Sequence, residues 1–467
     1  MTERIKIKEI NTSTQSRVDR YNPSKRIYVR AVYGLYQKLR RYIGWGLIVL
    51  FLVLPMMRWN GQQAVLFDIS KQQYHIFNMT LFPQDLTLLA WVFIIAAFAL
   101  FFITTYLGRV WCGYTCPQTV WTYIFIWFEE RFEGTANKRK RLDQMPWNFN
   151  KVWRKAAKHT GWIAVSLFTG LAFSSFFVPI EELYFNFFTF NSSFAITVNI
   201  LFFTTITYTN AGWMRSIVCT HMCPYSRFQS AMFDKDTYIV GYDTNRGEKR
   251  GPRRRKENAM QLGLGDCVDC DLCVQVCPTG IDIRNGLQYE CINCGACIDA
   301  CDETMLRMGY KKGLISYTSE QKLEGKATDV MRPKIIGYGL LLLLMIGLFI
   351  TNLVNLSSAE LEIVRDRTAL YRENSDGLIE NTYTLKVLNK TIETQIYKLS
   401  FTGIEDAQLI GPKQIVIAPG EILTQPIAIA VDTYEMKEKK VMITIKLTST
   451  TGDVEEIKQQ SPFFTGS

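Results

Sequence analysis

The sequence predicts a multi-domain membrane protein with three kinds of structure: a five-helix transmembrane bundle, a cysteine-rich α+β module and a C-terminal all-β sandwich. Three observations support this prediction. Long apolar runs recur through the first 356 residues, and eight of the twelve cysteines lie between Cys267 and Cys301. Beyond residue 356, apolar and polar residues alternate with period two, as they do in half-buried strands.

Length, charge and cysteine usage exclude several classes of protein. A chain of 467 residues is long enough for two or three domains. All cysteines lie between Cys112 and Cys301, which is not the distribution of a secreted disulfide scaffold. Residues 1–41 are polar and basic, with no apolar run before Tyr42. A cleavable signal peptide would place its apolar core earlier, so we predict none.

Five apolar runs are candidates for membrane spans. A helix of about 20 residues, rising 1.5 Å per residue, crosses a hydrocarbon layer of about 30 Å. Single buried helices of soluble proteins can be equally apolar, but five runs in one chain favour a membrane protein. The five predicted spans are Ile43–Trp59, Leu86–Leu107, Thr160–Ile180, Ser193–Tyr208 and Ile335–Leu356.

The placement of lysine and arginine predicts the orientation. The stretch Arg109–Lys158 contains ten basic residues, whereas the loop Glu181–Ser192 contains none. Because cytoplasmic loops carry the excess of basic residues, we place the N-terminus in the cytoplasm. With five spans, residues 109–158 and 210–334 lie in the cytoplasm. The residues after Leu356 then lie on the opposite side of the membrane, and we predict that this membrane is the inner membrane.

Two copies of a C-x3-C-P motif follow predicted spans two and four: Cys112, Cys116 and Pro117, then Cys219, Cys223 and Pro224. Each copy has an arginine nearby, so we infer an internal duplication. Helical i, i+4 spacing would place both sulfurs of a copy on one face, and the proline would end or redirect the helix. Four such thiols would form a soft metal or redox site. The alternative is that these cysteines are small apolar residues near helix ends.

His221 and Met222 lie inside the second motif. Thiols, a thioether and an imidazole together form a donor set suited to copper as Cu(I). The alternative for His221 is an ordinary polar residue at the membrane interface. The other two histidines, His75 and His159, lie outside the apolar cores, which disfavours a membrane haem with paired axial histidines.

The stretch Cys267–Cys301 reads C-x2-C-x2-C-x3-C-P and then C-x2-C-x2-C-x3-C. In this pattern three thiolates of one repeat bind one iron–sulfur cube, and the fourth comes from the other repeat. Zinc ribbons or a disulfide knot are the alternatives, but zinc sites normally pair two cysteines at a time. We therefore predict a bacterial-type two-cluster ferredoxin module. One [4Fe–4S] cluster is held by Cys267, Cys270, Cys273 and Cys301, and the other by Cys291, Cys294, Cys297 and Cys277. Cys301 is followed by Asp302 where the pattern has proline.

Two further segments complete the predicted organisation. The basic run Arg246–Lys256 favours a linker held against anionic lipid headgroups over a nucleic-acid site. Six or seven short alternating runs after Leu356, separated by turn signals, predict an immunoglobulin-like sandwich. That region contains no cysteine or histidine, so we assign it binding or docking. The predicted parts are a cytoplasmic tail (1–41), a membrane domain with four spans and both motifs (42–232), a linker and ferredoxin module (233–334), a fifth span (335–356) and the sandwich (357–467).

With these motifs in place, the chain resembles the cytochrome oxidase accessory proteins called CcoG, FixG or RdxA over nearly its full length. The resemblance implies a bacterial inner-membrane protein that assembles cbb(3)-type cytochrome oxidase, with a periplasmic C-terminal domain. It further implies cupric reductase activity, in which the clusters convert Cu(II) to Cu(I) and Cys112, Cys116, Cys219 and Cys223 lie nearest the copper. Implied partners are membrane lipid, and oxidase subunits or copper chaperones; nucleic acid is not among them.

Three functions remain open from the sequence. In the first, a cytoplasmic electron donor reduces the clusters, which pass electrons to the four membrane-edge cysteines and to Cu(II). In the second, the chain is a quinol-linked electron-transfer subunit that feeds a periplasmic reductase. In the third, it is an assembly scaffold whose clusters are structural.

Overall fold

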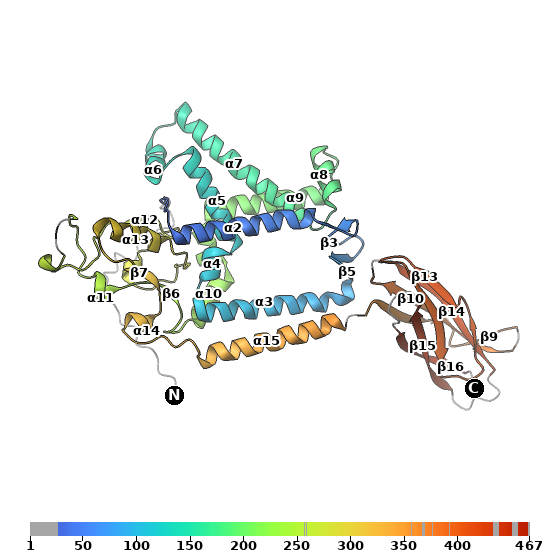
Figure 1. The fold of residues 1–467 in the computed structure, drawn as a ribbon. Coiled ribbons are helices and arrows are strands. Elements are labelled where there is room, and N and C mark those ends of the chain that lie inside the picture. The colour runs from blue at the N-terminus through green and yellow to red at the C-terminus, as the bar shows by residue number, and fades with distance from the viewer. Residues whose placement is uncertain are drawn as a thin grey trace. The chain divides into compact units, whose positions relative to one another are not determined.

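A computed structural model of the chain describes residues 27–255, 257, 259–355, 357–366, 369–375, 377–391, 393–432, 439–450 and 456–465. Residues 1–26 of the predicted tail, Lys256 of the basic run and Leu356 of the last predicted span lie outside this set. The chain divides into two compact units (Figure 1). The first comprises Met1–Val53, Phe93–Ser174 and Leu183–Ile346, and the second Leu54–Val92, Ser175–Glu182 and Gly347–Ser467.

Four helical segments of the described chain are long and apolar enough to cross a membrane, and each corresponds to a predicted span. Leu35–Met56 comprises α2 (Leu35–Val53) and a 3-10 turn, and Pro83–Leu107 comprises a 3-10 turn and α3 (Leu86–Leu107). Phe194–Met214 comprises α9 (Phe194–Tyr208) and a π-helix (Thr209–Met214), and Pro333–Val354 is α15.

The predicted count of five spans is not confirmed. The remaining predicted span, Thr160–Ile180, falls on α7 (Phe149–Ser174), which does not have a sufficiently long apolar stretch. Its first turns carry Lys151, Lys155 and Lys158, and the helix ends at Ser174, six residues before the predicted boundary. The apolar part of α7 is therefore shorter than the other four.

Short elements connect these helices and frame the cysteine-rich segment. Strand β6 (Ile239–Tyr242) pairs antiparallel with β7 (Ile315–Thr318), so the ends of the intervening segment are held together. The other helices of this part are α4 (Val110–Tyr114), α5 (Pro117–Phe132), α6 (Ala136–Gln144), α8 (Ile180–Phe188), α10 (Pro224–Met232), α11 (Thr244–Gly247), α12 (Leu272–Gln275), α13 (Ala296–Met308) and α14 (Glu320–Leu323).

A carboxylate of α13 caps the first candidate span. The backbone amides of Tyr36 and Gln37, at the start of α2, donate to the two carboxylate oxygens of Asp299, at 3.2 and 2.8 Å. A carboxylate at a helix N-terminus satisfies free amides and complements the helix dipole. The guanidinium of Arg40, one turn on, donates to the carbonyl oxygen of Cys294 at 2.6 Å. The cysteine-rich module and the beginning of α2 are thus tied together by charged hydrogen bonds.

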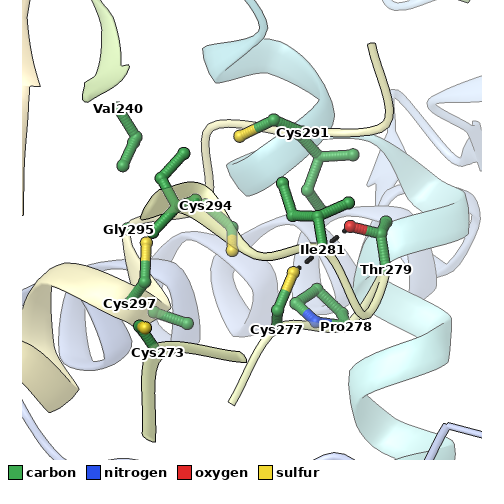
Figure 2. A pocket seen from close by; sticks show the side chains of 13 residues that line it. Val240, Cys273, Cys277, Pro278, Thr279, Ile281, Cys291, Cys294, Gly295 and Cys297 are labelled. Carbon is green, nitrogen blue, oxygen red and sulfur yellow. Dashed lines mark hydrogen bonds between the residues drawn. The ribbon is translucent and has the colours of Figure 1, made fainter. Parts of the chain in front are cut away.

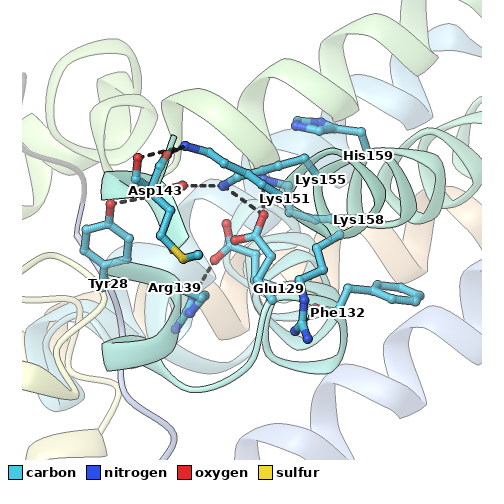
Figure 3. Close-up of polar contacts among 12 residues, drawn as sticks. Tyr28, Glu129, Phe132, Arg139, Asp143, Lys151, Lys155, Lys158 and His159 are labelled. Atoms are coloured by element: carbon cyan, nitrogen blue, oxygen red, sulfur yellow. Dashed lines mark hydrogen bonds and ion pairs between the residues drawn. The ribbon is translucent and has the colours of Figure 1, made fainter. Parts of the chain in front are cut away.

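A group of buried ion pairs joins α5, α6 and α7 (Figure 3). Glu129 of α5 pairs with Arg139 of α6, and both side chains are 1% exposed. Glu133, one turn further, pairs with Lys155 and Lys158 of α7 at 3.0 and 2.9 Å. These pairs explain why a helix with so many lysines packs inside the protein, since buried charges need partners.

The C-terminal region is an all-β sandwich of two sheets, in the order β12-β14-β10-β8 with β9 on β10, and β13-β11-β15-β16. Alternate side chains such as Tyr383, Leu385 and Ile445 are fully buried between the sheets. The strands are β8 (Ala359–Arg365), β9 (Arg372–Glu373), β10 (Ile379–Asn389), β11 (Gln395–Thr402), β12 (Gln408–Ile410), β13 (Gln414–Ile417), β14 (Ile422–Val431), β15 (Lys440–Ser449) and β16 (Glu456–Phe464). Small strands also lie between α2 and α3: β1 (Arg58–Trp59), β2 (Gln62–Gln63), β3 (Val65–Asp68), β4 (Gln73–Ile76) and β5 (Met79–Leu81).

Candidate iron–sulfur and thiol centre

The two cysteine repeats fold as tight loops, each of which leads into a helix. Asp269 and Asp271 in the first loop, and Asn293 in the second, adopt left-handed backbone conformations with φ of 55°, 55° and 50°. Aspartate and asparagine tolerate this region better than other side chains, so these residues allow the chain to turn sharply between cysteines. Since Asp302 stands where proline would interrupt a helix, α13 continues past Cys301 to Met308.

The structure brings the cysteines together in two groups. Burial raises the pKa of the Cys301 thiol to about 12, and the neighbouring thiols that raise it further are Cys273, Cys267 and Cys270 of the first repeat. Burial raises the pKa of Cys277 too, and its thiol neighbour is Cys294 of the second repeat. Each repeat thus places its fourth cysteine beside the other repeat. This arrangement fits the crossed ligand sets, which stay a prediction.

A cavity lies at the second group (Figure 2). The cysteines that line the cavity are Cys277, Cys291, Cys294, Cys297 and, from the first group, Cys273. Most of the remaining wall is apolar, with Val240 and Ile281, and Thr279 adds a hydroxyl 3.3 Å from the Cys277 sulfur. Thiolates are the ligands of iron–sulfur clusters, and an apolar shell excludes water from them. The residues present therefore fit such a cluster. Because burial raises the pKa of Cys291 to about 12, iron binding must displace the thiol protons.

The crossed ligand sets predict which cysteine pairs belong to one cluster. We expect Cys270→Ala and Cys301→Ala each to remove the same cluster, so the double variant retains the other one. The combination Cys270→Ala with Cys297→Ala is expected to remove both clusters. Iron and acid-labile sulfide, measured after anaerobic purification, distinguish these cases. Loss of both clusters in the Cys270/Cys301 variant would contradict the crossed sets.

The two C-x3-C-P copies share one backbone geometry. Cys112 lies in α4 and Cys219 in a π-helical turn (Val218–Met222), while Cys116 and Cys223 are extended residues directly before α5 and α10. The amide of Cys116 donates to the carbonyl oxygen five residues earlier at 3.0 Å, and that of Cys223 does the same at 2.8 Å. The expected helical i, i+4 geometry is therefore wrong: each helix ends before its second cysteine, where the chain turns into the proline.

The four thiols of these copies are half-buried neighbours. Burial raises the pKa of Cys112 to about 11 and that of Cys219 to about 12. Cys116 and Cys223 lie close enough to raise both values further, and the Gln229 amide donates to the Cys112 sulfur at 3.3 Å. The sequence did not single out Gln229. The duplicated halves thus meet at one thiol cluster, as the sequence predicts.

The predicted copper ligands His221 and Met222 are exposed, whereas the four thiols are half-buried. Among the described residues, no three His, Cys, Asp or Glu side chains lie close enough to hold a single metal ion. The four thiols would have to move together to ligate copper. A cubane cluster differs in this respect, because each thiolate binds a different iron atom. The copper ligand set stays a prediction.

Cys112 and Gly113 pack directly against the second cysteine loop. Cys112 contacts an apolar cluster of buried residues that contains Ile292 and Cys294. A Cβ atom on Gly113 would lie 2.7 Å from the Ile292 carbonyl oxygen and 2.9 Å from the Cys294 Cα. Only glycine allows the two backbones to approach so closely. The thiol cluster and the predicted second iron–sulfur centre are therefore adjacent.

The two motif arginines have different partners. Arg109 donates to the carbonyl oxygens of Ser226 and Tyr289. Burial raises the pKa of Cys112, Cys219 and Cys291, and the Arg109 charge offsets part of that rise. Arg109 therefore lies between the thiol cluster and the cysteine loop. Arg215 instead pairs with the buried Glu129 carboxylate at 2.6 Å.

Part of the predicted basic linker packs onto the first cysteine repeat. Arg253 donates to the Tyr310 hydroxyl at 3.0 Å and to the Cys267 carbonyl oxygen at 3.2 Å. Arg246 pairs with Asp266 at 2.6 Å. These arginines hold the loop, so the linker contributes to the module's structure.

Comparison with family models agrees with these centres. A 4Fe-4S dicluster domain matches residues 214–320, and a 4Fe-4S binding domain matches residues 89–133. A model described as the IG-like fold at the C-terminal of FixG, putative oxidoreductase, matches residues 349–466. The matched iron–sulfur segments include both C-x3-C-P copies and the eight cysteines of the two repeats. The chain therefore carries iron–sulfur domains beside apolar helices suited to a membrane.

Three relatives are similar over most of their length. Nitrogen fixation protein FixG of Rhizobium meliloti is 32% identical over 91% of this chain and 87% of its own. Protein RdxA and Protein RdxB of Cereibacter sphaeroides are 36% and 34% identical, over 82% and 90% of this chain and 83% and 91% of theirs. A crystal structure of a FixG-related protein from Vibrio parahaemolyticus covers 24% of this chain and 100% of its own, at 32% identity and a TM-score of 0.23. The chain belongs to the FixG, RdxA and RdxB family.

Proposed function

We propose that this chain is an inner-membrane electron-transfer protein that reduces Cu(II) to Cu(I) during assembly of a cbb(3)-type cytochrome oxidase. Two [4Fe–4S] clusters bound between Cys267 and Cys301 supply one electron for each copper ion. The thiols of Cys112, Cys116, Cys219 and Cys223 receive the copper. The N-terminus and clusters face the cytoplasm, and the sandwich faces the periplasm, where oxidase subunits or copper chaperones dock.

One observation carries this proposal: Cys112 and Gly113 lie against the loop Ile292–Cys294. Electron transfer requires donor and acceptor sites to be close, and this backbone contact supports a direct route from the second centre to the thiol cluster. Soft thiolates bind Cu(I) in preference to harder ions, so the site favours the reduced product. Arg109 keeps a positive charge beside both centres, which offsets part of the cost of burying thiolates there.

Single-turnover reduction of Cu(II) tests the proposal. Full-length protein is purified without oxygen, reduced with dithionite and freed of excess reductant, and Cu(I) is then captured by a colorimetric chelator. We expect Cys116→Ser and Cys223→Ser each to reduce the rate more than tenfold while the iron and sulfide content stays unchanged. His221→Ala and Met222→Leu, measured alongside, report whether these side chains contribute. Wild-type rates in both cysteine variants would refute the copper site.

A scaffold function makes a different prediction. If the clusters were only structural, Cys270→Ala would lower the iron content and still support oxidase assembly in cells. We expect instead that this variant loses both cluster reduction and oxidase activity.

A further inference from the structure

A cavity of about 680 Å³ lies between α2, α5 and α7, beside the cysteine-rich module. Its lining along α2 extends from Gln37 to Leu52, which corresponds to about 22 Å of helix. The early turns of α2 contribute polar side chains, and the later turns contribute Ile48 and Phe51. The volume is in the range of sites for small organic ligands, and the lining is mostly apolar with a few polar groups. Its shape and polarity suit a molecule with a polar head and an apolar tail.

The polar end of the cavity adjoins the second cysteine group. Val276 and Ala296, the chain neighbours of Cys277 and Cys297, line the cavity. Arg40, also in the lining, donates to the Cys294 carbonyl oxygen at 2.6 Å. Only these lining residues would separate a ligand head group at this end from the predicted cluster ligands that follow them in the chain.

Tyr123 supplies a weakly partnered hydrogen-bonding group at the same end. Its hydroxyl oxygen is inaccessible to solvent, and the hydrogen-bonding group beside it is the Cys294 thiol. A thiol is a weak acceptor. The Arg40 guanidinium lies over the Tyr123 ring, 4.5 Å from its centre. A buried hydroxyl with so weak a partner costs free energy, and a ligand oxygen that came within reach of it would reduce that cost.

Aromatic side chains form the open side of the cavity. Trp45, Trp127 and Phe168 line it and are 58%, 56% and 50% exposed. Since Trp45 belongs to a candidate membrane span, this opening suits entry from lipid. The Glu130 carboxylate lines the cavity together with Arg30, Arg40 and Arg41, so its polar end carries charges of both signs. A head group with hydrogen-bonding oxygens fits this end, and its position beside the predicted clusters favours one that can be oxidised and reduced.

We propose that this cavity binds a lipid-soluble quinol, with its head group between Arg40 and Tyr123, and that the quinol is the donor of electrons to the iron–sulfur centres. This donor replaces the cytoplasmic one expected from the sequence. Oxidation breaks two O–H bonds of the quinol and yields the quinone, two protons and two electrons. The two clusters take one electron each, and the Glu130 carboxylate accepts the protons in turn and releases them to water. The donor role rests on the proposed function; quinone binding does not.

Binding is tested on the full-length protein in lipid nanodiscs with decylubiquinone as the probe. Gly44→Leu adds bulk to the lining, whereas Gly46→Leu, on the same helix, adds it where nothing lies within 4 Å. We expect saturable quenching of tryptophan fluorescence in the wild type and in Gly46→Leu, and loss of saturation in Gly44→Leu. Tyr123→Phe removes one hydrogen bond and is expected to weaken binding about fivefold to tenfold.

Electron donation is tested separately, without copper. We expect decylubiquinol to bleach the visible absorbance of the clusters in the wild type and in Gly46→Leu, but not in Gly44→Leu, and more slowly in Glu130→Gln. Identical quenching in the two glycine variants, or quenching that never saturates because lipid chains fill the cavity, would overturn the binding site. Binding without bleaching would overturn the donor role alone. Dithionite-reduced protein that fails to reduce Cu(II) would instead refute the proposed function and leave the quinone site standing.

Discussion

Glu129→Ala is expected to lower the free energy of unfolding by about 3–5 kcal/mol, because it leaves buried positive charge without its partner. The Glu129 carboxylate pairs with Arg139, which is 1% exposed, and with Arg215 at 2.6 Å. These contacts join α5 to α6 and to the segment that leads into the second C-x3-C-P copy. The variant should therefore reduce both stability and the reactivity of the thiol cluster.

The midpoint of thermal unfolding in detergent measures this effect. Glu303→Ala is the matched control, since Glu303 pairs with Arg307 on the surface, with side chains 50% and 74% exposed. Exposed pairs contribute about 0–1 kcal/mol, so the control should unfold near the wild-type temperature. Equal shifts in the two variants would contradict the importance of the buried pair.

Gly113→Ala is expected to slow electron transfer to the thiol cluster without changing the number of clusters. A Cβ atom at this position would overlap the backbone of Ile292 and Cys294, so α4 must move away from the cysteine loop. Forcing an extra carbon into a packed contact costs about 1–3 kcal/mol, and small displacements of reacting groups lower rates strongly. We expect Cu(II) reduction by dithionite-reduced protein to fall about tenfold or more.

Gly46→Ala provides the comparison for this variant. Gly46 lies in α2, where an added Cβ meets nothing within 4 Å, and alanine is the better helix former by about 1 kcal/mol. The control should be as stable as the wild type or more so, with the same rate. A Gly113→Ala protein with wild-type rate and full iron content would show that this contact is not the electron route.

The sequence predicts the parts of this fold that local patterns encode. Cysteine spacing predicts the iron–sulfur domains, apolar length predicts four of the candidate spans, and alternation predicts the C-terminal strands. The alternation is weak in strand β16 (Glu456–Phe464). Its first half contains only one apolar residue, and Pro462, which has no backbone N–H to donate, lies near its end. The segment is therefore a strand because it pairs with β15.

Contacts between distant segments could not be predicted in this way. The first half of α7 carries lysines, and two of them, Lys155 and Lys158, pack inside the protein because they pair with Glu133 at the end of α5. The close approach at Gly113, the hydrogen bond from Gln229 to Cys112 and the weakly partnered Tyr123 hydroxyl each depend on residues more than 100 positions away or on the packing of several helices. A single sequence records no such pairing.

The Asp299 cap on α2 links metal loading to the lifetime of the protein. Asp299 lies in α13 between Cys297 and Cys301, so the position of its carboxylate depends on the loop that iron would hold in place. Without iron, we expect α13 to loosen and the first turn of α2 to fray. Poorly ordered, exposed segments of this kind are preferred sites of proteolysis. Iron starvation or oxidative damage would then shorten the half-life of the whole chain, and defective copies would be cleared before they could occupy a partner.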